Sequence, residues 1–342
     1  METLVSSLSP QLVFPINHAS DVAAARRAAH KLADTLGFDE VKAGRLAIVI
    51  TEAGTNILKH AGEGMLYIAA AQSSARMAGV DVLAIDSGPG IADLAFSIQD
   101  GVSTAGTAGT GLGALRRQSD EFDVWSMRDK GAVFFMRLWQ GAAPPEPCGV
   151  EVGALCVPLA GEEVCGDAWG MLCDRDGASL VGADGLGHGP DAAKASAGAV
   201  EALQRPASTS SELLQLAHER LRGTRGAAVS VARVDYADMQ LRFAGIGNVS
   251  GIVVDGDTRR TLVSHNGIVG HNMRKVQEFS ADFGPGALCI LHSDGIQTQW
   301  DLDAYPGLVA RAPAVIAAVL MRDFIRRRDD AMVLVARRKE QP

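Results

Sequence analysis

A short segment rich in proline and glycine divides this chain into two halves. Residues 141–149, GAAPPEPCG, contain three prolines and two glycines, which disfavour both helices and sheet hydrogen bonding. A chain of 342 residues also exceeds the roughly 100–200 residues of an ordinary domain. We therefore expect one domain over residues 1–140, a linker over 141–149 and a second domain over 150–342.

Composition and charge exclude several classes of protein. The formal net charge is -8, and Lys and Arg are scattered, so no basic surface for nucleic acid is expected. The N-terminus has no basic segment followed by an apolar run, and no stretch approaches the ~18 apolar residues of a membrane span. We expect a soluble, cytoplasmic protein that binds neither nucleic acid nor membrane.

The cysteines suggest neither a disulfide framework nor a zinc site. They are odd in number and contain no C-x-x-C pair, so we expect reduced thiols. The residues concerned are Cys148, Cys156, Cys165, Cys173 and Cys289.

Patterning predicts helices and strands in both halves. In the first half we expect strands over 11–16, 65–71, 80–85 and 133–138, and helices over 21–36 and 39–60, each opened by a capping Asp. In the second half we expect helices over 191–203 and 211–222, and strands over 153–158, 178–183, 227–234, 240–244, 251–254, 287–293 and 331–336. This pattern predicts an α+β protein in which helices flank sheets.

Three motifs of the first half stand in the order expected of a nucleotide site. Glu52 and Asn56 are four residues apart and so share one helix face. Asp86 follows an apolar strand and begins the sequence DSGPG. The glycine-rich run GTAGTGLG at 106–113 leads into a helical stretch, which offers backbone amides to phosphates. Alone, the Glu52–Asn56 pair is more typical of a solvated helix face and the DSGPG segment of a turn, while the glycine run is equally typical of a flexible loop.

Together the E-x-x-x-N, D-x-G-x-G and G-T-G-L-G motifs resemble those of the GHKL (Bergerat-fold) ATPases, and residues 100–126 resemble the RsbT-like serine kinases and anti-sigma regulators. The resemblance implies a Bergerat α/β sandwich in which Asn56 coordinates Mg²⁺, Asp86 binds the adenine amino group and Glu52 is the general base. It also implies that ATP is bound by Gly88, Gly90, Gly106, Thr107, Gly109, Thr110, Gly111, Leu112 and Gly113. The sequence departs from relatives at Ala132, where many carry Thr.

The second half spaces aspartates at the ends of apolar β runs. They occur in the dipeptides Gly166-Asp167, Asp184-Gly185, Asp294-Gly295 and Asp329-Asp330. Hard carboxylate oxygens of this kind suit Mg²⁺ or Mn²⁺ better than zinc. Any one Asp-Gly pair is more typical of a hairpin turn, but four such sites favour a metal centre.

The strings GDAWG, ADGLGHG, AGIGNVSG, LHSDGI and RRRDDAMVLVARR resemble the SpoIIE-type, RsbX-like branch of the metal-dependent PPM (type 2C) phosphatases. The resemblance implies a β-sandwich flanked by helices and two Mn²⁺ or Mg²⁺ ions, with Asp330 in a supporting position. It assigns the metals to Asp167, Asp184, the carbonyl of Gly185, Asp294 and Asp329.

The two resemblances together predict a bifunctional regulator of bacterial stress or sigma-factor signalling. By resemblance, its serine/threonine kinase and phosphatase activities would act on STAS-domain proteins, such as stressosome subunits or anti-anti-sigma factors. The alternative is a front domain that binds ATP only as a partner switch, without transferring phosphate. The sequence leaves open a homodimer and the roles of His188, Arg222, Arg225 and Asn248.

Overall fold

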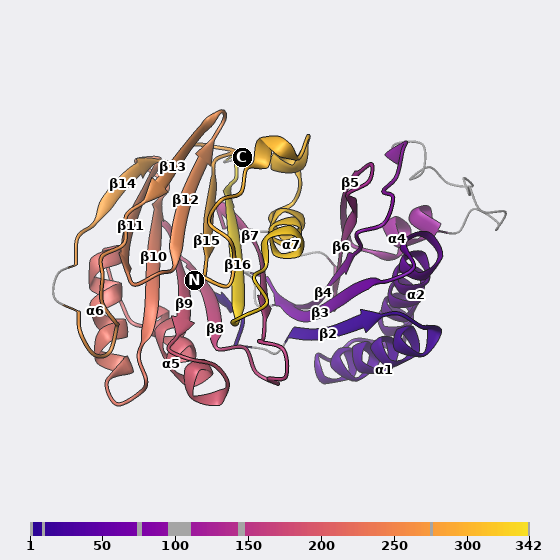
Figure 1. Cartoon of the computed structure of the whole chain (residues 1–342), viewed down its shortest axis with the longest axis horizontal. Coiled ribbons are helices and arrows are strands. Elements are labelled where there is room, and N and C mark those ends of the chain that lie inside the picture. The colour runs from indigo at the N-terminus through magenta and orange to yellow at the C-terminus, as the bar shows by residue number, and fades with distance from the viewer. Residues whose placement is uncertain are drawn as a thin grey trace. The chain divides into compact units, whose positions relative to one another are not determined.

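The computed structural model describes residues 3–8, 11–73, 77–94, 111–142, 148–273 and 276–340 (Figure 1). The chain forms two compact units. The rear unit comprises Met1–Leu8, Glu146–Trp300 and Val319–Pro342, and the front unit comprises Ser9–Pro145 and Asp301–Ala318. The N-terminal residues therefore belong to the unit that is otherwise built from the second half of the sequence.

The front unit contains a five-stranded antiparallel sheet in the order β2-β3-β4-β6-β5. Its strands are β2 (Gln11–Ile16), β3 (Gly64–Gln72), β4 (Ala78–Ile85), β5 (Glu121–Met127) and β6 (Gly131–Trp139). The helices are α1 (Ala19–Thr35), α2 (Glu40–Asn56) and α4 (Gly111–Gln118), and a π-helical turn, η1 (Ile57–Ala61), follows α2. Figure 1 shows α1 and α2 along the sheet, against which both pack.

The helix α2 is capped by Asp39 as the sequence predicts, whereas α1 begins at Ala19, two residues before the predicted start at Asp21. The Asp39 side chain accepts a hydrogen bond from the N–H of Lys42 (2.7 Å). Asp21, in the first turn of α1, accepts from the N–H of His18 (2.8 Å). Small apolar residues at helical spacing let α1 approach the sheet closely, and they are Val22, Ala25, Ala29 and Ala33.

Residues 301–318 complete the front unit, although they come from late in the sequence. On β5, Asp123 accepts a hydrogen bond from the N–H of Ala312 (2.6 Å). The indole N–H of Trp125 donates to the carbonyl of Pro306 (3.1 Å). The first contact accounts for Asp123, a polar residue within β5, which is a strand that the hydrophobic pattern does not predict.

The rear unit contains two antiparallel sheets. One has the order β1-β8-β9-β10-β11-β14 and the other β13-β12-β15-β16-β7. The first is made of β1 (Thr3–Ser6), β8 (Asp167–Cys173), β9 (Gly177–Gly185), β10 (Ala227–Asp235), β11 (Gln240–Ile246) and β14 (Phe279–Asp282). The second is made of β7 (Val150–Val157), β12 (Ser250–Asp255), β13 (Thr258–Leu262), β15 (Leu288–His292) and β16 (Ala331–Arg338).

Two apolar layers hold the rear unit together. Residues of both sheets form one core, which includes Phe243, Phe283 and Leu334. A second core lies between the first sheet and the helices α5 (Pro190–Glu201) and α6 (Ser210–Leu221), which pack on β8–β11 (Figure 1). A β-sandwich flanked by helices is thus confirmed. A further helix, α7 (Pro313–Phe324), precedes β16, and the sequence pattern does not predict it.

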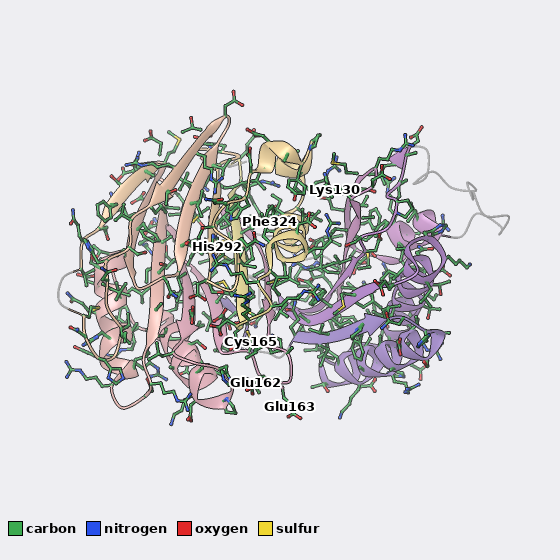
Figure 2. The ribbon with its side chains drawn as sticks, in the orientation of Figure 1. Lys130, Glu162, Glu163, Cys165, His292 and Phe324 are labelled. Atoms are coloured by element: carbon green, nitrogen blue, oxygen red, sulfur yellow. A yellow bond between two sulfur atoms is a disulfide. The ribbon has the colours of Figure 1, made fainter. Side chains whose placement is uncertain are left out.

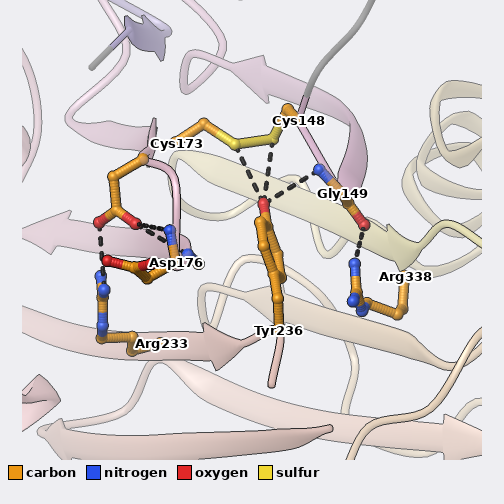
Figure 3. Close-up of a disulfide and its surroundings, with 9 residues drawn as sticks. Cys148, Gly149, Cys173, Asp176, Arg233, Tyr236 and Arg338 are labelled. Carbon is orange, nitrogen blue, oxygen red and sulfur yellow. Dashed lines mark hydrogen bonds and ion pairs between the residues drawn. A yellow bond between two sulfur atoms is a disulfide. The ribbon is translucent and has the colours of Figure 1, made fainter. Parts of the chain in front are cut away.

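The expectation of five reduced thiols is wrong for two of them. Cys148 and Cys173 form a disulfide, and the Tyr236 hydroxyl lies 3.2 Å from the Cys173 sulfur (Figure 3). The same hydroxyl accepts a hydrogen bond from the N–H of Gly149 (3.1 Å). The two cysteines are 25 residues apart, and only the folded sheet brings them together. No described helix is both long and apolar enough to span a membrane.

Candidate functional site

Two carboxylates of the rear unit face each other on neighbouring strands. Asp167 begins β8 and Asp184 lies near the end of β9, and the antiparallel register makes them direct partners. Directly opposed residues of an antiparallel pair lie on one face of the sheet with Cβ atoms about 4.5–5.5 Å apart. Two of the four acidic side chains predicted as metal ligands are therefore brought together by strand register alone.

The other two predicted acidic ligands join them from loops of the second sheet. Asp294 follows β15, and its backbone N–H donates to the carboxylate of Asp184. The dipeptide Asp329-Asp330 precedes β16 and lies against the Asp294 loop, where a side chain at Gly295 would collide with the carbonyl of Asp330. Of the pair, Asp330 is buried, whereas Asp329 is exposed and accepts a hydrogen bond from the N–H of Asp330 (2.9 Å).

Burial and mutual repulsion disfavour the ionised forms of these carboxyls. Burial raises the pKa of Asp167 well above its usual range, and the Asp184 carboxylate raises it further. Burial, with the Asp294 and Asp329 carboxylates, raises the pKa of Asp184 to about 7. Burial is also the main cause of the raised pKa of Asp330. A cation among these groups would favour the ionised forms instead.

Two carboxylate oxygens have unsatisfied bonding capacity. Oδ2 of Asp167 and Oδ2 of Asp330 are buried without a hydrogen-bond partner among the described residues, while Oδ1 of Asp330 accepts from the N–H of Leu159 (2.8 Å). Such oxygens are costly to bury unpaired, and they are the ligands that Mg²⁺ and Mn²⁺ prefer. The residues fit a divalent cation, although the described side chains contain no ready-made group of three or more metal ligands.

Neighbouring polar side chains orient the carboxylates. The buried Ser293 hydroxyl donates to Asp167, and the Asn248 amide donates to Oδ2 of Asp294 (2.5 Å). The sequence pattern left the role of Asn248 open. It did not predict a role for Ser293, which directly precedes Asp294 in LHSDGI. The N–H of Gly185 donates to the carbonyl of Gly166 (3.2 Å), which fixes the end of β9 beside the start of β8.

His188 lies in the loop after Asp184-Gly185 and contacts a carboxylate of the preceding loop. Its Nδ1 lies 2.6 Å from a carboxylate oxygen of Glu162. Glu162 projects from the loop between β7 and β8, the loop that also holds Cys165 (Figure 2). This contact ties the loop that leads to Asp167 to the loop that follows Asp184.

In the front unit, Glu52 and Asn56 occupy the last turn and a half of α2. Both side chains are half-buried, and Nδ2 of Asn56 is buried without a hydrogen-bond partner among the described residues. The helix widens to the π-helical turn η1 directly after Asn56, a distortion that is common at functional sites. The unsatisfied Nδ2 is a hydrogen-bond donor, so it fits an acceptor such as a phosphate oxygen, whereas a metal ion could be bound only through Oδ1.

Asp86 is fixed at the end of β4 by backbone hydrogen bonds. Its Oδ1 accepts from the N–H of Gly88 (2.9 Å) and from the N–H of Ala132 (3.3 Å). A side chain at Gly131 would collide with the carbonyl of Asp86, so the β5–β6 turn can approach only because residue 131 is glycine. The side chain of residue 132 is not needed for these contacts, which involve only its backbone.

The Asp86 loop lies beside the end of α2, and the described part of the glycine-rich motif lies on a helix that packs on α2. A Cβ at Gly88 would lie 2.7 Å from the Cβ of Ala61 in η1, which places the Asp86 loop beside the turn that follows Asn56. Gly111 begins α4, which packs on α2, while Leu112 is half-buried and Gly113 is buried. Gly90 lies in the described Asp86 loop, whereas Gly106, Thr107, Gly109 and Thr110 lie outside the described residues.

Comparison with known proteins assigns a family to each half. The model of the histidine kinase-like ATPase domain matches residues 14–138, and that of stage II sporulation protein E (SpoIIE) matches residues 174–339. The serine/threonine-protein kinase RsbT of Bacillus subtilis (strain 168) is 36% identical over 119 residues, which is 35% of this chain and 89% of RsbT.

The phosphoserine phosphatase RsbX of the same organism is 27% identical over 139 residues, which is 40% of this chain and 69% of RsbX. A solved chain from "The bacterial stressosome: a modular system that has been adapted to control secondary messenger signaling" superposes with a TM-score of 0.52 at 30% identity, over 55% of this chain and 99% of that one. The chain therefore belongs to the RsbT family of histidine kinase-like ATPase domains through its front half, which is fused to an RsbX-like, SpoIIE-type PPM phosphatase domain.

Proposed function

We propose that this protein is a bifunctional partner-switching regulator that phosphorylates and dephosphorylates STAS-domain proteins on serine or threonine. The observation that carries the phosphatase half is the pair of opposed carboxylates, Asp167 and Asp184, with a buried, unpartnered oxygen on Asp167. The similarity to RsbT, a kinase, and to RsbX, a phosphatase, supports the pairing of opposed activities.

In the rear unit, the metal ions would be held by Asp167, Asp184, Asp294 and Asp329, with the carbonyl of Gly185. The buried Asp330, with one unpartnered oxygen, is suited to support them. Two Mn²⁺ or Mg²⁺ ions supply charge neutralisation for the phosphoryl group and acidify water. Asn248 and Ser293 keep the Asp294 and Asp167 carboxylates oriented through the hydrogen bonds described above. The chain itself needs no covalent nucleophile.

In the front unit, Asn56 would hold the Mg²⁺ of ATP, and Asp86 would accept a hydrogen bond from the adenine amino group. The bound nucleotide supplies the phosphoryl group. Glu52 lies one helical turn before Asn56, so both side chains lie on the same face of α2. Its carboxylate can take the proton of an acceptor serine or threonine hydroxyl, which gives this site the one base that a kinase needs.

A short linker between two domains of opposite activity raises the effective concentration of each active site at a shared target. Incubation of the full chain with a STAS-domain protein and MgATP should therefore add phosphate to that protein. Removal of the nucleotide by gel filtration and addition of Mn²⁺ should then remove that phosphate, as followed by intact-protein mass spectrometry. Phosphate removal without any addition would reject the kinase half in favour of an ATP-bound switch fused to an active phosphatase.

A further inference from the structure

The turn between α6 and β10, residues 222–226, is unusually well fixed for a surface turn. The Thr224 hydroxyl donates to the carbonyl of Leu221 (2.7 Å) and accepts from the N–H of Gly226 (3.0 Å). The carbonyl of Thr224 lies 2.9 Å from Nε2 of His271. These bonds leave the turn little freedom, so the side chain at its tip, Arg225, is presented from a fixed backbone.

This turn is attached to the loop that follows the Asp184 metal motif. The N–H of Leu186 donates to the carbonyl of Gly226 (3.0 Å), and β10 then pairs Ala227 with Gly185. Gly226 itself is closely packed, since a Cβ there would lie 2.6 Å from a methyl carbon of Ile268. Arg225 is therefore held directly beside the loop over residues 185–189.

The guanidinium of Arg225 lies over that loop but is only loosely engaged. Its Nη2 is 3.0 Å from Oδ2 of Asp191, and the two side chains are 51% and 70% exposed. Its Nη1 would lie 3.1 Å from a Cβ at Gly187. Exposed ion pairs contribute little to stability, so another carboxylate can replace Asp191 at small cost.

The surroundings favour an anionic protein ligand at this position. The neighbouring Leu186 is an exposed apolar side chain, at 49%. The site beyond it gathers several carboxylates, which repel an incoming phosphoprotein, so a fixed cation at the rim improves approach. An exposed apolar residue beside a guanidinium is suited to a peptide segment that carries an acidic side chain.

We propose that Arg225 is a substrate-binding residue that pairs with an acidic side chain next to the phosphorylated residue of the target protein. The proposal rests on the phosphatase function proposed above. Arg225 stands three residues before Ala228, the strand partner of Asp184, and its guanidinium pairs with Asp191 beside the loop over residues 185–189 rather than with the carboxylate cluster. Arg225 therefore meets the flank of the substrate, and Asp191 is the internal carboxylate that the substrate displaces.

The test uses the full chain with Mn²⁺ and three substrates. These are p-nitrophenyl phosphate and two phosphoserine peptides that differ only in Glu or Gln beside the phosphoserine. Arg225→Ala should raise KM for the Glu peptide about tenfold, as expected for loss of one charge-assisted pair, with kcat unchanged. KM for the Gln peptide and for p-nitrophenyl phosphate should change much less, because neither carries the flanking carboxylate.

Two variants sharpen the result. Asp191→Asn removes the internal competitor and should lower KM for the Glu peptide, an effect that a merely structural ion pair would not produce. Arg222→Ala, a change of the C-cap residue of α6 at the other end of the same turn, is the matched control and should leave all three KM values unchanged.

An equal rise of KM for all three substrates would overturn the assignment, because Arg225 would then bind the phosphoryl group itself. An active wild-type enzyme whose KM values are indifferent to Arg225→Ala would reject this inference and leave the proposed phosphatase function intact. Absence of any hydrolysis by the wild type would instead reject the proposed function and this inference with it.

Discussion

Asp167 and Asp184 are direct cross-strand partners at one end of the β8–β9 ladder. Like charges directly opposite each other destabilise a sheet, and burial makes this pair more costly still. The two carboxylates therefore destabilise the sheet unless protons or cations neutralise them. Residues that lower the stability of the fold in this way are typical of a functional site.

The raised pKa of Asp184 predicts that stability depends on pH and metal. The pKa rises from 3.8 to about 7 on folding, so the folded protein binds more protons than the unfolded chain between these values. In EDTA, the melting temperature of the rear unit should therefore fall as the pH rises from about 4 to about 7. Differential scanning calorimetry of the full chain measures this fall.

Mn²⁺ should reverse the trend, because it binds the ionised carboxylates. An excess of a hundredfold over Kd should add about 3 kcal/mol at neutral pH and much less near pH 4. Asp184→Asn is the control, in which the fall of the melting temperature between pH 4 and 7 should become shallower. A melting temperature in EDTA that rises steadily over this range would contradict the assigned cluster.

Phosphatase activity should depend on metal and not on cysteine. EDTA should silence hydrolysis of a phosphoserine peptide, and Mn²⁺ or Mg²⁺ should restore it. Asp184→Ala or Asp294→Ala should each cost about 100-fold or more, because losing one carboxylate leaves a metal ion under-coordinated. Cys289→Ala, a change of a buried thiol remote from any proposed role, is the comparison and should cost far less.

Reagents that act on cysteine phosphatases give an independent check. Vanadate and thiol alkylation should leave the rate unchanged, since no phospho-cysteine forms. If hydrolysis continues both in EDTA and in the Asp294→Ala variant, the aspartates are merely turn residues.

Substitutions of Asn56 and Glu52 should affect ATP binding and phosphoryl transfer differently. Asn56→Ala should remove most Mg²⁺-dependent ATP binding, as measured by calorimetry, because Asn56 is the proposed metal ligand. Glu52→Ala should keep ATP binding and abolish transfer of label from radioactive ATP to a STAS-domain protein, because only the base is lost. Unaltered ATP affinity in the Asn56 variant would refute its assignment.

Much of the fold follows from local sequence signals. The capping Asp39 and an apolar stripe predict α2, and continuous apolar runs predict β9, β10 and β16. By contrast, β8 has the sequence DAWGMLC, in which a polar start and an internal glycine hide the strand. The position of β8 depends on its pairing with β1 and β9. The strand β1 is distant in the sequence, and the local pattern of β9 does not indicate which segment pairs with it.

The candidate site, too, could be predicted from the sequence only in part. Residue types and spacing identify the aspartates as candidates, because carboxylates beside glycines at strand ends are local features. They do not reveal that Asp167 faces Asp184, that Ser293 supports Asp167, or that Arg225 lies over Gly187. Those relationships depend on strand register and on turns far apart in the chain, which no local pattern encodes.

The strand β1 predicts that the rear unit needs the N-terminus of the chain. Residues 3–6 form the edge strand beside β8, and Ser7 exchanges hydrogen bonds with the backbone of Trp169 (2.9 and 3.3 Å). Leu4 and Val5 pack against the two cores of the rear unit. Deletion of residues 1–8 should therefore uncover apolar surface and the edge of β8, the strand that begins with Asp167.

The loss should be about 2–4 kcal/mol, since two half-buried aliphatic side chains and one row of strand pairing are removed. The melting temperature and Mn²⁺ affinity of the deleted protein should both fall. Ser7→Ala is the mild comparison, with a smaller loss because it removes only the side-chain hydrogen bonds to Trp169. A synthetic peptide of residues 1–8 should partly restore both quantities, because it can pair again with the free edge of β8. If the deleted protein melts and binds Mn²⁺ as the full chain does, β1 contributes nothing to the site, and β8 is held by β9 alone.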